Sequence, residues 1–428
     1  MTDRTDKTVG TQEAPVRALL LGIQESQMAE SEARSLLAEL KGLADTLGIE
    51  IAGMELVKVR ESTAALGMGA GKAQEVADLA QSLEVECLIF DRDLSPTQQR
   101  NWEQLTERSC LDRQEVILRI FSMRAQTREA RLQIELAELK HALPRLAHKY
   151  IDLNRQRGGR YGTKGSGEKK LELDRRGIQN RIDRLKEELR GVEAVRQTQR
   201  KRREKTPVPS CALVGYTNAG KSSLLNAMTN ADTLVEDKLF ATLDPTTRRM
   251  ERADGSAILL TDTVGFIRRL PHDLVNAFRS TLEEATLADL VLIVLDASDP
   301  EVIEQHRTTI QVLDELGAGD KPRLIVLNKI DRVDHPDIFE GLAFRFKDAI
   351  RISARTGDGL EELSQRIDSI LGGSVSRICF PADRHDLAAL VHRTGSAVEE
   401  EYTDDAIRMK ARLPERVRGQ LREWLEEE

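Results

Sequence analysis

The first hundred residues alternate between two patterns of hydrophobic positions. Short apolar runs, typical of buried strands, are separated by stretches whose apolar residues recur every three or four positions, as in helices. This alternation predicts a small parallel α/β unit over residues 15–111. Residues 1–14 are polar and show neither pattern, so we expect a disordered tail there. The expected strands are residues 16–22, 49–59 and 85–91, and the expected helices are residues 31–47, 73–82 and 96–105.

From residue 112 to residue 150 the pattern is that of one long helix. Leu132, Leu136 and Leu139 begin a series at spacings of four and three, which predicts an apolar seam. Pro144 predicts a kink within this helix. The same spacing returns between Ile178 and Val192. Two helices with matching seams and a joining loop predict an antiparallel helical hairpin over residues 112–206.

The formal net charge of -8 hides one strongly basic segment. Residues 154–206 hold 18 of the 64 Lys+Arg and 8 of the 72 Asp+Glu, a net of +10, so the rest holds 46 and 64, a net of -18. One basic segment on an acidic protein suits a single contact with a phosphate backbone. A solvated helix face of mixed charge is the alternative, and charge alone does not decide between them.

The loop that joins the two long helices is longer than a helical hairpin needs. Residues 157–167 read RGGRYGTKGSG. Glycines let a backbone approach a ligand closely, and Arg157, Arg160 and Lys164 would supply phosphate contacts. We favour contact with RNA over a loop that has no role.

The composition excludes several classes of protein. Aromatic residues make up 4% of the chain, which argues against a cleft built on ring stacking. No apolar run approaches the roughly 18 residues of a membrane helix, and the polar start does not resemble a signal peptide. The four cysteines lie far apart without a CxxC pair, so neither disulfides nor a zinc site is predicted. We expect a reduced, cytoplasmic protein that does not bind DNA, and a monomer, because no self-complementary apolar stripe is left over.

A phosphate-binding loop follows a short apolar strand at residues 211–214. Residues 215–222 read GYTNAGKS, which fits GxxxxGKS, and residues 223–228 favour a helix. Glycines let backbone N–H groups face phosphate oxygens, and the helix N-terminus adds positive potential. Lys221 would bridge the β- and γ-phosphates, and the Ser222 hydroxyl would bind Mg²⁺. The expected binding residues in this loop are Gly215, Tyr216, Thr217, Asn218, Ala219, Gly220, Lys221 and Ser222.

Three later motifs stand at the ends of apolar strands, in the order typical of a GTPase. In DTVG, residues 262–265, Asp262 is placed to hold the metal through water, and the Gly265 N–H can sense the γ-phosphate. In NKID, residues 328–331, the Asp331 carboxylate can accept two hydrogen bonds from guanine. Adenine offers no such donor pair, so GTP is the predicted nucleotide. The backbone of SAR, residues 353–355, would meet the guanine oxygen. The other binding residues expected in and beside these motifs are Thr263, Val264, Phe266, Asn328, Lys329, Ile330, Ser353, Ala354 and Arg355.

These motifs resemble translation-factor-type GTPases, and more closely the HflX family of ribosome-associated GTPases. The resemblance covers nearly the whole chain, including FDRDLSPTQQRNWE (90–103), LELDRRGIQNRI (171–182) and FATLDPTTR (240–248). One departure is GSGEK at residues 165–169, where the family usually has GPGET, and the missing proline makes this loop less rigid.

We expect an α/β fold. The motifs predict a P-loop GTPase domain at residues 207–371, with a doubly wound sheet whose phosphate loop follows the first strand, and residues 372–428 are predicted to form a small α+β domain similar to that of the family. In the last domain we expect a strand at 377–381, a helix at 386–392, a strand pair at 396–413 and a terminal helix at 414–427. The resemblance further implies that Thr242 binds Mg²⁺ and the γ-phosphate. The nucleotide contacts that it implies for this segment are Phe240, Ala241, Thr242, Leu243 and Asp244.

Phe266 stands where many GTPases of this class carry a glutamine that orients the attacking water. A phenyl ring cannot form that hydrogen bond, so we expect slow intrinsic hydrolysis that a partner stimulates. Asn218 matches the asparagine of potassium-activated GTPases, and K⁺ is therefore a candidate second cation. The alternative for Asn218 is turn chemistry, since asparagine tolerates a left-handed backbone. The candidate catalytic residues are Lys221, Thr242, Gly265 and Asn218.

The resemblance also implies a function. The GTP form would bind the large ribosomal subunit through ribosomal RNA, split or rescue ribosomes under stress, and leave on hydrolysis. One alternative is an assembly GTPase that acts on large-subunit precursors. Another is an RNA-binding protein with a vestigial GTPase, against which the intact Lys221, Thr242 and Asp331 argue.

Overall fold

The computed structural model describes residues 16–156, 166–203, 208–229, 239–252, 257–269, 284–333, 336–394, 396–413 and 415–426. The described chain forms two compact units. The first comprises residues up to Ile120 together with Glu138–Gln179, and the second comprises Phe121–Ala137 together with the residues from Asn180 onwards. The RNA-contact residues predicted at 157, 160 and 164 lie outside the described residues.

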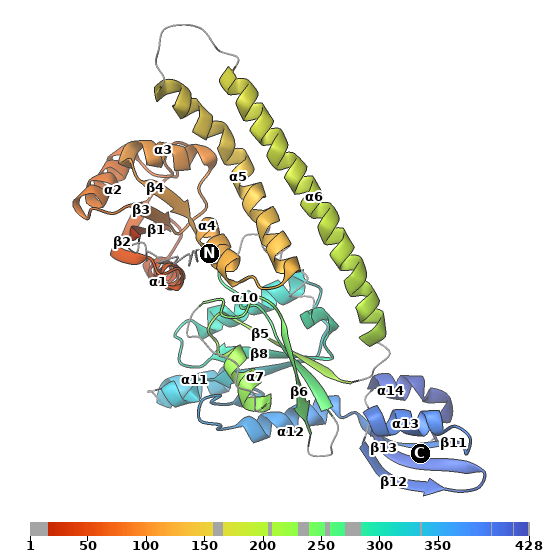
Figure 1. The fold of residues 1–428 in the computed structure, drawn as a ribbon. Coiled ribbons are helices and arrows are strands. Elements are labelled where there is room, and N and C mark those ends of the chain that lie inside the picture. Colours follow the sequence, from red (N-terminus) through yellow and green to blue (C-terminus); the bar gives the residue numbers. More distant parts are fainter. Residues whose placement is uncertain are drawn as a thin grey trace, which may run out of the picture. The chain divides into compact units, whose positions relative to one another are not determined.

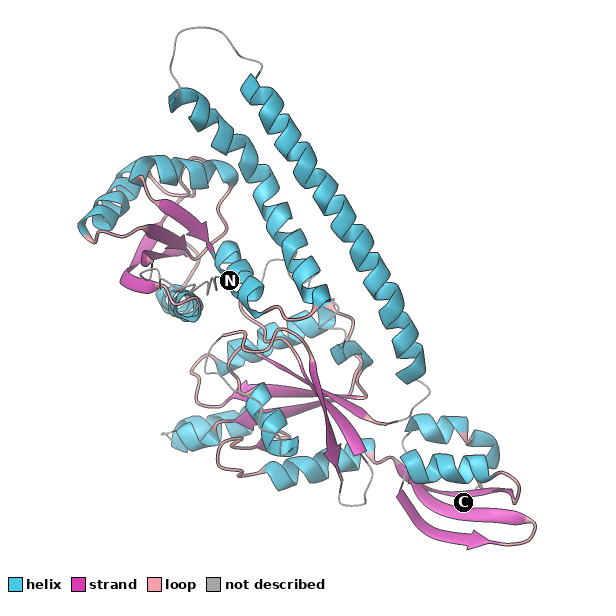
Figure 2. Ribbon diagram, viewed as in Figure 1, coloured by secondary structure: helices cyan, strands magenta, loops and turns pink. Residues whose placement is uncertain are grey.

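The first unit contains the predicted parallel α/β fold. Its sheet has the order β2-β1-β3-β4, and the pairs β1–β2, β1–β3 and β3–β4 are all parallel (Figures 1 and 2). Leu19, Leu88 and Trp102 are fully buried in its core. The last strand, β4, was not predicted. The elements are β1 Arg17–Glu25, α1 Glu30–Thr46, β2 Glu50–Val59, α2 Ala70–Ser82, β3 Cys87–Phe90, α3 Pro96–Thr106 and β4 Ser109–Asp112.

The expected single helix after residue 112 is wrong, because the structure has two helices there. α4 spans Arg113–Arg124 and α5 spans Arg128–Gln156. The Thr127 side chain accepts a hydrogen bond from the Ala130 N–H at 3.1 Å, the pattern of an N-cap that begins a new helix. α5 continues past Pro144 as one element.

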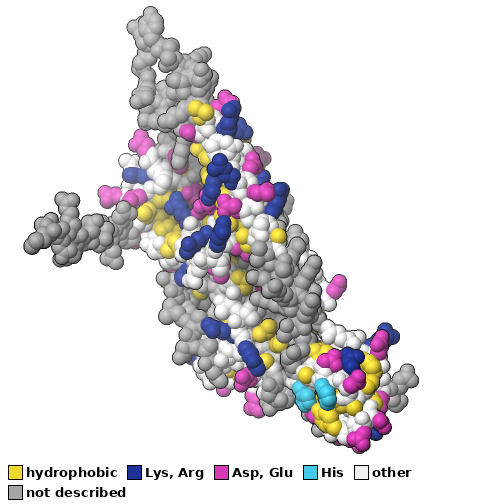
Figure 3. Space-filling model, turned by 45° about the vertical axis from the view of Figure 1, so that its right-hand side comes forward, with side chains coloured by type: hydrophobic (Ala, Val, Ile, Leu, Met, Phe, Trp, Pro, Cys, Tyr) yellow, Lys and Arg dark blue, Asp and Glu magenta, His cyan; other side chains and the backbone are white. Residues whose placement is uncertain are grey.

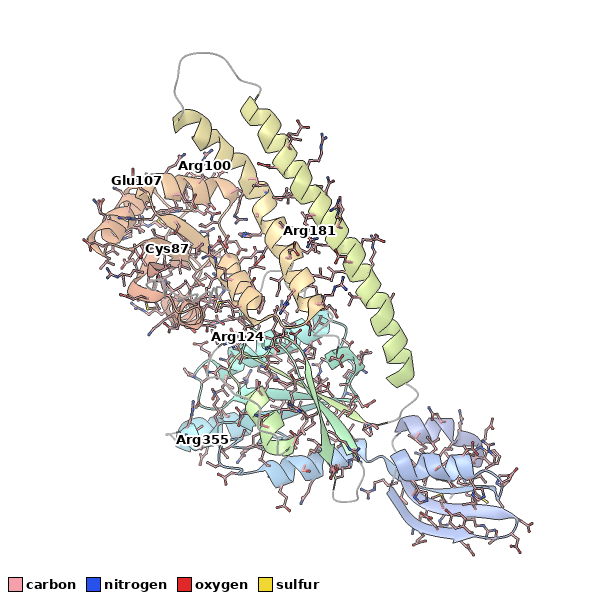
Figure 4. All side chains as sticks on the ribbon, in the orientation of Figure 1. Cys87, Arg100, Glu107, Arg124, Arg181 and Arg355 are labelled. Carbon is pink, nitrogen blue, oxygen red and sulfur yellow. The ribbon has the colours of Figure 1, made fainter. Side chains whose placement is uncertain are left out.

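The helix α6, Ser166–Arg203, returns beside α5 as the second half of the hairpin (Figure 1). Arg181 on α6 binds Glu135 on α5 through two hydrogen bonds of 2.7 Å each, and Figure 4 shows Arg181 pointing toward α5. Figure 3 shows basic and acidic side chains interspersed over the described part of the long helices. That mixture, on the face shown, is typical of a solvated helix surface.

The predicted doubly wound sheet lies in the second unit. Its strand order is β10-β9-β8-β5-β7-β6, with β6 antiparallel to β7 and the other neighbours parallel. Leu213, Leu292 and Val326 are fully buried in its core. The elements are β5 Ser210–Gly215, α7 Lys221–Thr229, β6 Thr246–Glu251, β7 Ala257–Asp262, β8 Leu290–Asp296, α10 Val302–Glu315, β9 Arg323–Asn328, α11 Pro336–Arg345, β10 Ile350–Arg351 and α12 Leu360–Leu371.

The same unit ends in a small α+β domain with the sheet order β11-β13-β12. Its elements are β11 Ser374–Pro381, α13 His385–Thr394, β12 Ser396–Tyr402, β13 Ala406–Leu413 and α14 Glu415–Gln420. The terminal helix is shorter than predicted. After Gln420 the chain forms a 3₁₀ turn and returns to β11, where the Glu426 N–H donates to the Arg377 carbonyl at 3.0 Å. This sheet pairing competes with continued helix and ends it.

Candidate nucleotide-binding site

Two glycines let the phosphate loop between β5 and α7 take its shape. Gly215 has φ +148° and Gly220 has φ +90°, both in the region that side chains rarely adopt. A Cβ at Gly215 would collide with the Val294 carbonyl, and one at Gly220 with the Asn328 side-chain amide. The loop therefore packs closely against Val294 of β8 and Asn328 of β9, and this packing positions its N–H groups and the start of α7.

Lys221 is the buried cation of this loop. It is 6% exposed, and its Nζ donates to the carbonyls of Gly215 at 3.2 Å and Tyr216 at 2.8 Å. Burial disfavours the charged amine and lowers the pKa of Lys221 to about 8, against the opposing effect of Asp262. The ammonium is thus held beside the phosphate position by weak acceptors that a phosphate can replace.

The three side chains expected to hold Mg²⁺, two directly and Asp262 through water, converge on one point. The Ser222 and Thr242 hydroxyls donate to Asp262 Oδ2 at 2.6 Å and 2.8 Å, and the two hydroxyl oxygens lie 2.8 Å apart. Burial raises the pKa of Asp262, and Lys221 opposes this shift. Two hydroxyls and a carboxylate are the hard oxygen donors that Mg²⁺ prefers, so the residues present fit this ion.

The segment after β7 is bonded to the phosphate loop through its backbone. The Thr217 N–H donates to the Phe266 carbonyl at 2.8 Å, and the Phe266 N–H donates to the Gly215 carbonyl at 3.0 Å. A side chain at Gly265 would contact Thr217 and the Lys221 amine. The Phe266 ring is buried, with 1% exposure, and fills the core.

At the opposite end of the site, Asn328 joins three of the predicted motifs. Its amide donates to the Ala219 carbonyl at 2.9 Å, and its side-chain oxygen accepts from the Ala354 N–H at 3.0 Å. Ser353 donates to Asp331 Oδ1 at 2.6 Å, and Arg355 lies 2.7 Å from Asp331 Oδ2. The Ser353 hydrogen bond, helped by Arg355, holds the pKa of Asp331 below its usual range, so its carboxylate is charged and able to accept from guanine.

Two further positions complete the account of the predicted residues. Lys329 has a left-handed backbone, φ +62°, and its amine lies 2.7 Å from the Asp296 carboxylate. Asp296 was not predicted, although its place at the end of β8, beside the other strand ends, could have indicated it. Asn218 is exposed with φ +60°, so the turn chemistry expected for it is present. Arg355 is 68% exposed at the rim (Figure 4).

The sequence did not predict that the corner between α4 and α5 joins this site. Both carboxylate oxygens of Asp244, two residues after Thr242, accept hydrogen bonds from this corner. The phosphate loop and the segment that carries Thr242 line one pocket with Gly265.

Among the described residues, no helix has the length and apolar character needed to cross a membrane.

Three features define a P-loop GTPase: the doubly wound sheet, the phosphate loop after its first strand, and the NKID motif after β9, which is expected to recognise guanine. Three families match the chain in succession. They are described as GTP-binding GTPase N-terminal (residues 34–122), GTP-binding GTPase Middle Region (residues 124–203) and 50S ribosome-binding GTPase (residues 210–329).

Known proteins match over nearly the full length. GTPase HflX of Akkermansia muciniphila is 45% identical over 96% of this chain and 97% of its own, and that of Lacrimispora saccharolytica is 43% identical over 93% of each. A GTP-binding protein of Sulfolobus solfataricus, solved with GDP, is 25% identical over 83% of this chain and 98% of its own, with a TM-score of 0.44. The chain belongs to the HflX family of GTPases and hydrolyses GTP.

Proposed function

We propose that this protein is a GTP-dependent factor of the large ribosomal subunit. Its GTP form binds the subunit, splits or rescues ribosomes under stress, and leaves when GTP is hydrolysed. Membership of the HflX family and the match of residues 210–329 to a 50S ribosome-binding GTPase support the ribosome as partner. The net charge of +10 over residues 154–206 supports a contact with ribosomal RNA near Arg157, Arg160 and Lys164.

The residues around the phosphate loop have distinct roles in this proposal. The Lys221 amine leaves its two carbonyl partners and binds the β- and γ-phosphates, while the Gly265 N–H binds the γ-phosphate. Ser222 and Thr242 would hold Mg²⁺ directly and Asp262 through water, and the bound ion would supply positive charge that offsets the charge of the phosphates. Because Thr242 reaches this position only when its segment is in place, the γ-phosphate can order that segment.

The residues near Asn328 recognise the base. Asp331 accepts the two guanine donors, Asn328 contacts the other side of the ring, and the Lys329 stem covers its face. Arg355 lies on the Asp331 carboxylate, so guanine takes its place or shares that oxygen. The backbone of Ser353–Arg355 meets the guanine oxygen.

Hydrolysis by the protein alone is slow in this proposal. Phe266 offers no hydrogen bond to water, and its ring is buried in the core. A partner that supplies a polar group or reorders this segment is therefore required for fast turnover.

The test is GTP hydrolysis with and without purified large ribosomal subunits. We expect strong stimulation by the subunits, and we expect the triple variant Arg157→Ala, Arg160→Ala, Lys164→Ala to lose it. A matched control removes three exposed charges from the described part of α6, as Arg184→Ala, Lys186→Ala, Arg190→Ala, and should keep it.

Each outcome separates the possibilities. Stimulation that survives the first variant keeps the ribosome and moves the contact elsewhere. Stimulation by large-subunit precursors but not by finished subunits or 70S ribosomes favours the assembly role. No stimulation by any of these particles contradicts the ribosomal function and leaves the GTPase.

A further inference from the structure

The segment that carries Thr242 is attached on both sides to a part of the chain outside the GTPase domain. On one side, the rings of Phe240 and Phe121 meet edge to face, with centroids 4.6 Å apart and an interplanar angle of 74°. Phe121 belongs to α4, and the two rings are 1% and 2% exposed. The backbone of Phe240 has φ +55°, a conformation that residues other than glycine rarely adopt. The packing of its ring holds it there.

On the other side, Asp244 is bonded to the start of α5. Its Oδ2 accepts from the N–H groups of Gln126 at 3.0 Å and Thr127 at 3.1 Å. Its Oδ1 accepts from the Thr127 hydroxyl at 2.6 Å. The same hydroxyl oxygen accepts from Ala130 N–H inside the helix. A carboxylate is favoured at the positive end of a helix, so this is a charge-assisted connection rather than an incidental contact.

Thr242 lies between these two attachments. Its hydroxyl reaches Asp262 at 2.8 Å and Ser222 at 2.8 Å, which is the position expected for the metal. A segment of five residues, 240–244, is thus fixed at its first residue by Phe121 and at its last by Thr127. The residue expected to hold the metal, Thr242, is in the middle, so a shift at either end of the segment moves it.

We propose that the corner between α4 and α5 is a positioning element of the GTPase site, with Phe121, Gln126 and Thr127 as its positioning residues. The corner holds the segment 240–244 in the arrangement that binds GTP with Mg²⁺. Coupling between two sites is reciprocal, so GTP also favours the bonded start of α5. The helix α5 begins at this corner, and a ligand that displaces its start changes the preference for GTP over GDP.

The test uses the full chain without ribosomes, so its result does not depend on the ribosomal function. Thr127→Val keeps the shape of the side chain and removes the hydroxyl that joins Asp244 to α5. We expect it to weaken binding of guanylyl imidodiphosphate with Mg²⁺ about fivefold and to leave GDP binding within about twofold. Calorimetry or fluorescence with each nucleotide measures both values.

Ser95→Ala is the matched control. Ser95 caps α3 by accepting from the Gln98 N–H at 3.2 Å, and among the described contacts it does not touch the segment 240–244. It removes a helix cap of the same kind, and its melting temperature should fall as that of Thr127→Val does. The ratio of the two nucleotide affinities should remain that of the natural chain.

A second variant tests the proposal independently if Thr127→Val misfolds. Asp244→Asn removes the charge and one acceptor oxygen. It should lower the ratio of the affinity for guanylyl imidodiphosphate to the affinity for GDP. In the double variant the two effects should not add, because both remove one connection. Equal weakening of both nucleotides, or an unchanged ratio in Thr127→Val and Asp244→Asn alike, would overturn the proposal and leave the corner as a helix cap.

Discussion

Lys221 is a buried cation whose only described acceptors are the backbone carbonyls of Gly215 and Tyr216. Carbonyls stabilise an ammonium less than a phosphate does, and burial lowers the pKa of Lys221 to about 8. A bound phosphate stabilises the charged form and raises this pKa. Nucleotide binding is therefore coupled to a proton at this residue.

That coupling predicts the pH dependence of GDP affinity. Below the free pKa of Lys221, about 8, the amine is already charged and affinity is constant. Above it, binding must take up a proton, so affinity falls as pH rises, by up to about tenfold per pH unit. Titrations of GDP between about pH 7 and about pH 9 measure the slope. Lys221→Met should bind weakly at every pH and show no such slope apart from that of the guanine ring itself. An equal slope in both proteins would refute the assignment to Lys221.

Asn218 supports a second prediction at this scale. If its side chain binds K⁺, hydrolysis should be modestly faster in K⁺ than in Na⁺, and equal rates would dispose of the hypothesis. Asn218→Gly is the informative variant, because glycine accepts the φ of +60° and removes only the amide. Loss of K⁺ stimulation in this variant assigns the ion to the side chain, whereas a fully normal enzyme leaves only turn chemistry.

Among the elements, the strands that carry the four motifs were predicted, whereas β8, a plain apolar run, and the break between α4 and α5 were not. The phosphate loop and the three later motifs follow buried strands, and parallel strands bring their carboxyl ends to one edge, so their convergence could be foreseen. The break between α4 and α5 could not, because apolar spacing continues through it and Asp244, more than a hundred residues later, stabilises it. β4 has only four residues, too few for a reliable pattern.

The small C-terminal domain permits a test of its independence. Leu421 is 1% exposed and packs in the core formed by β11, β13 and the last helices. Leu421→Ala should destabilise this domain by about 2–5 kcal/mol, because it leaves a cavity. Hydrogen exchange in β11 and β13 should rise while GDP affinity stays unchanged. Tyr402→Ala, a truncation at a 55% exposed position of the same sheet, should have little effect on exchange. A matching loss of GDP affinity would show that the domain supports the nucleotide site.

For the whole molecule, the sequence predicted the class, the nucleotide and the parallel and doubly wound sheets. Those predictions rest on short motifs that follow apolar strands and on chemistry that few other arrangements can perform. The contact of the segment 240–244 with α4 and α5 could not be predicted from the sequence, since no local pattern pairs Asp244 with Thr127. The predicted RNA contacts stay predictions, because Arg157, Arg160 and Lys164 lie outside the described residues.

The return of the chain to β11 also bears on contacts between copies of the molecule. In the order β11-β13-β12, β11 is an edge strand, and an uncovered edge can recruit a strand from another molecule. Leu425 forms an antiparallel β-bridge with Ile378, and the Glu426 N–H donates a hydrogen bond to the Arg377 carbonyl. On the opposite edge, β12 carries Glu399, Glu400 and Glu401, which lie beside Lys410, His392 and Arg408, and charged side chains on an edge strand disfavour pairing with another strand. Each edge of this sheet thus carries a feature that disfavours strand pairing between copies, namely the cover at Arg377 and Ile378 on β11 and the charged side chains on β12.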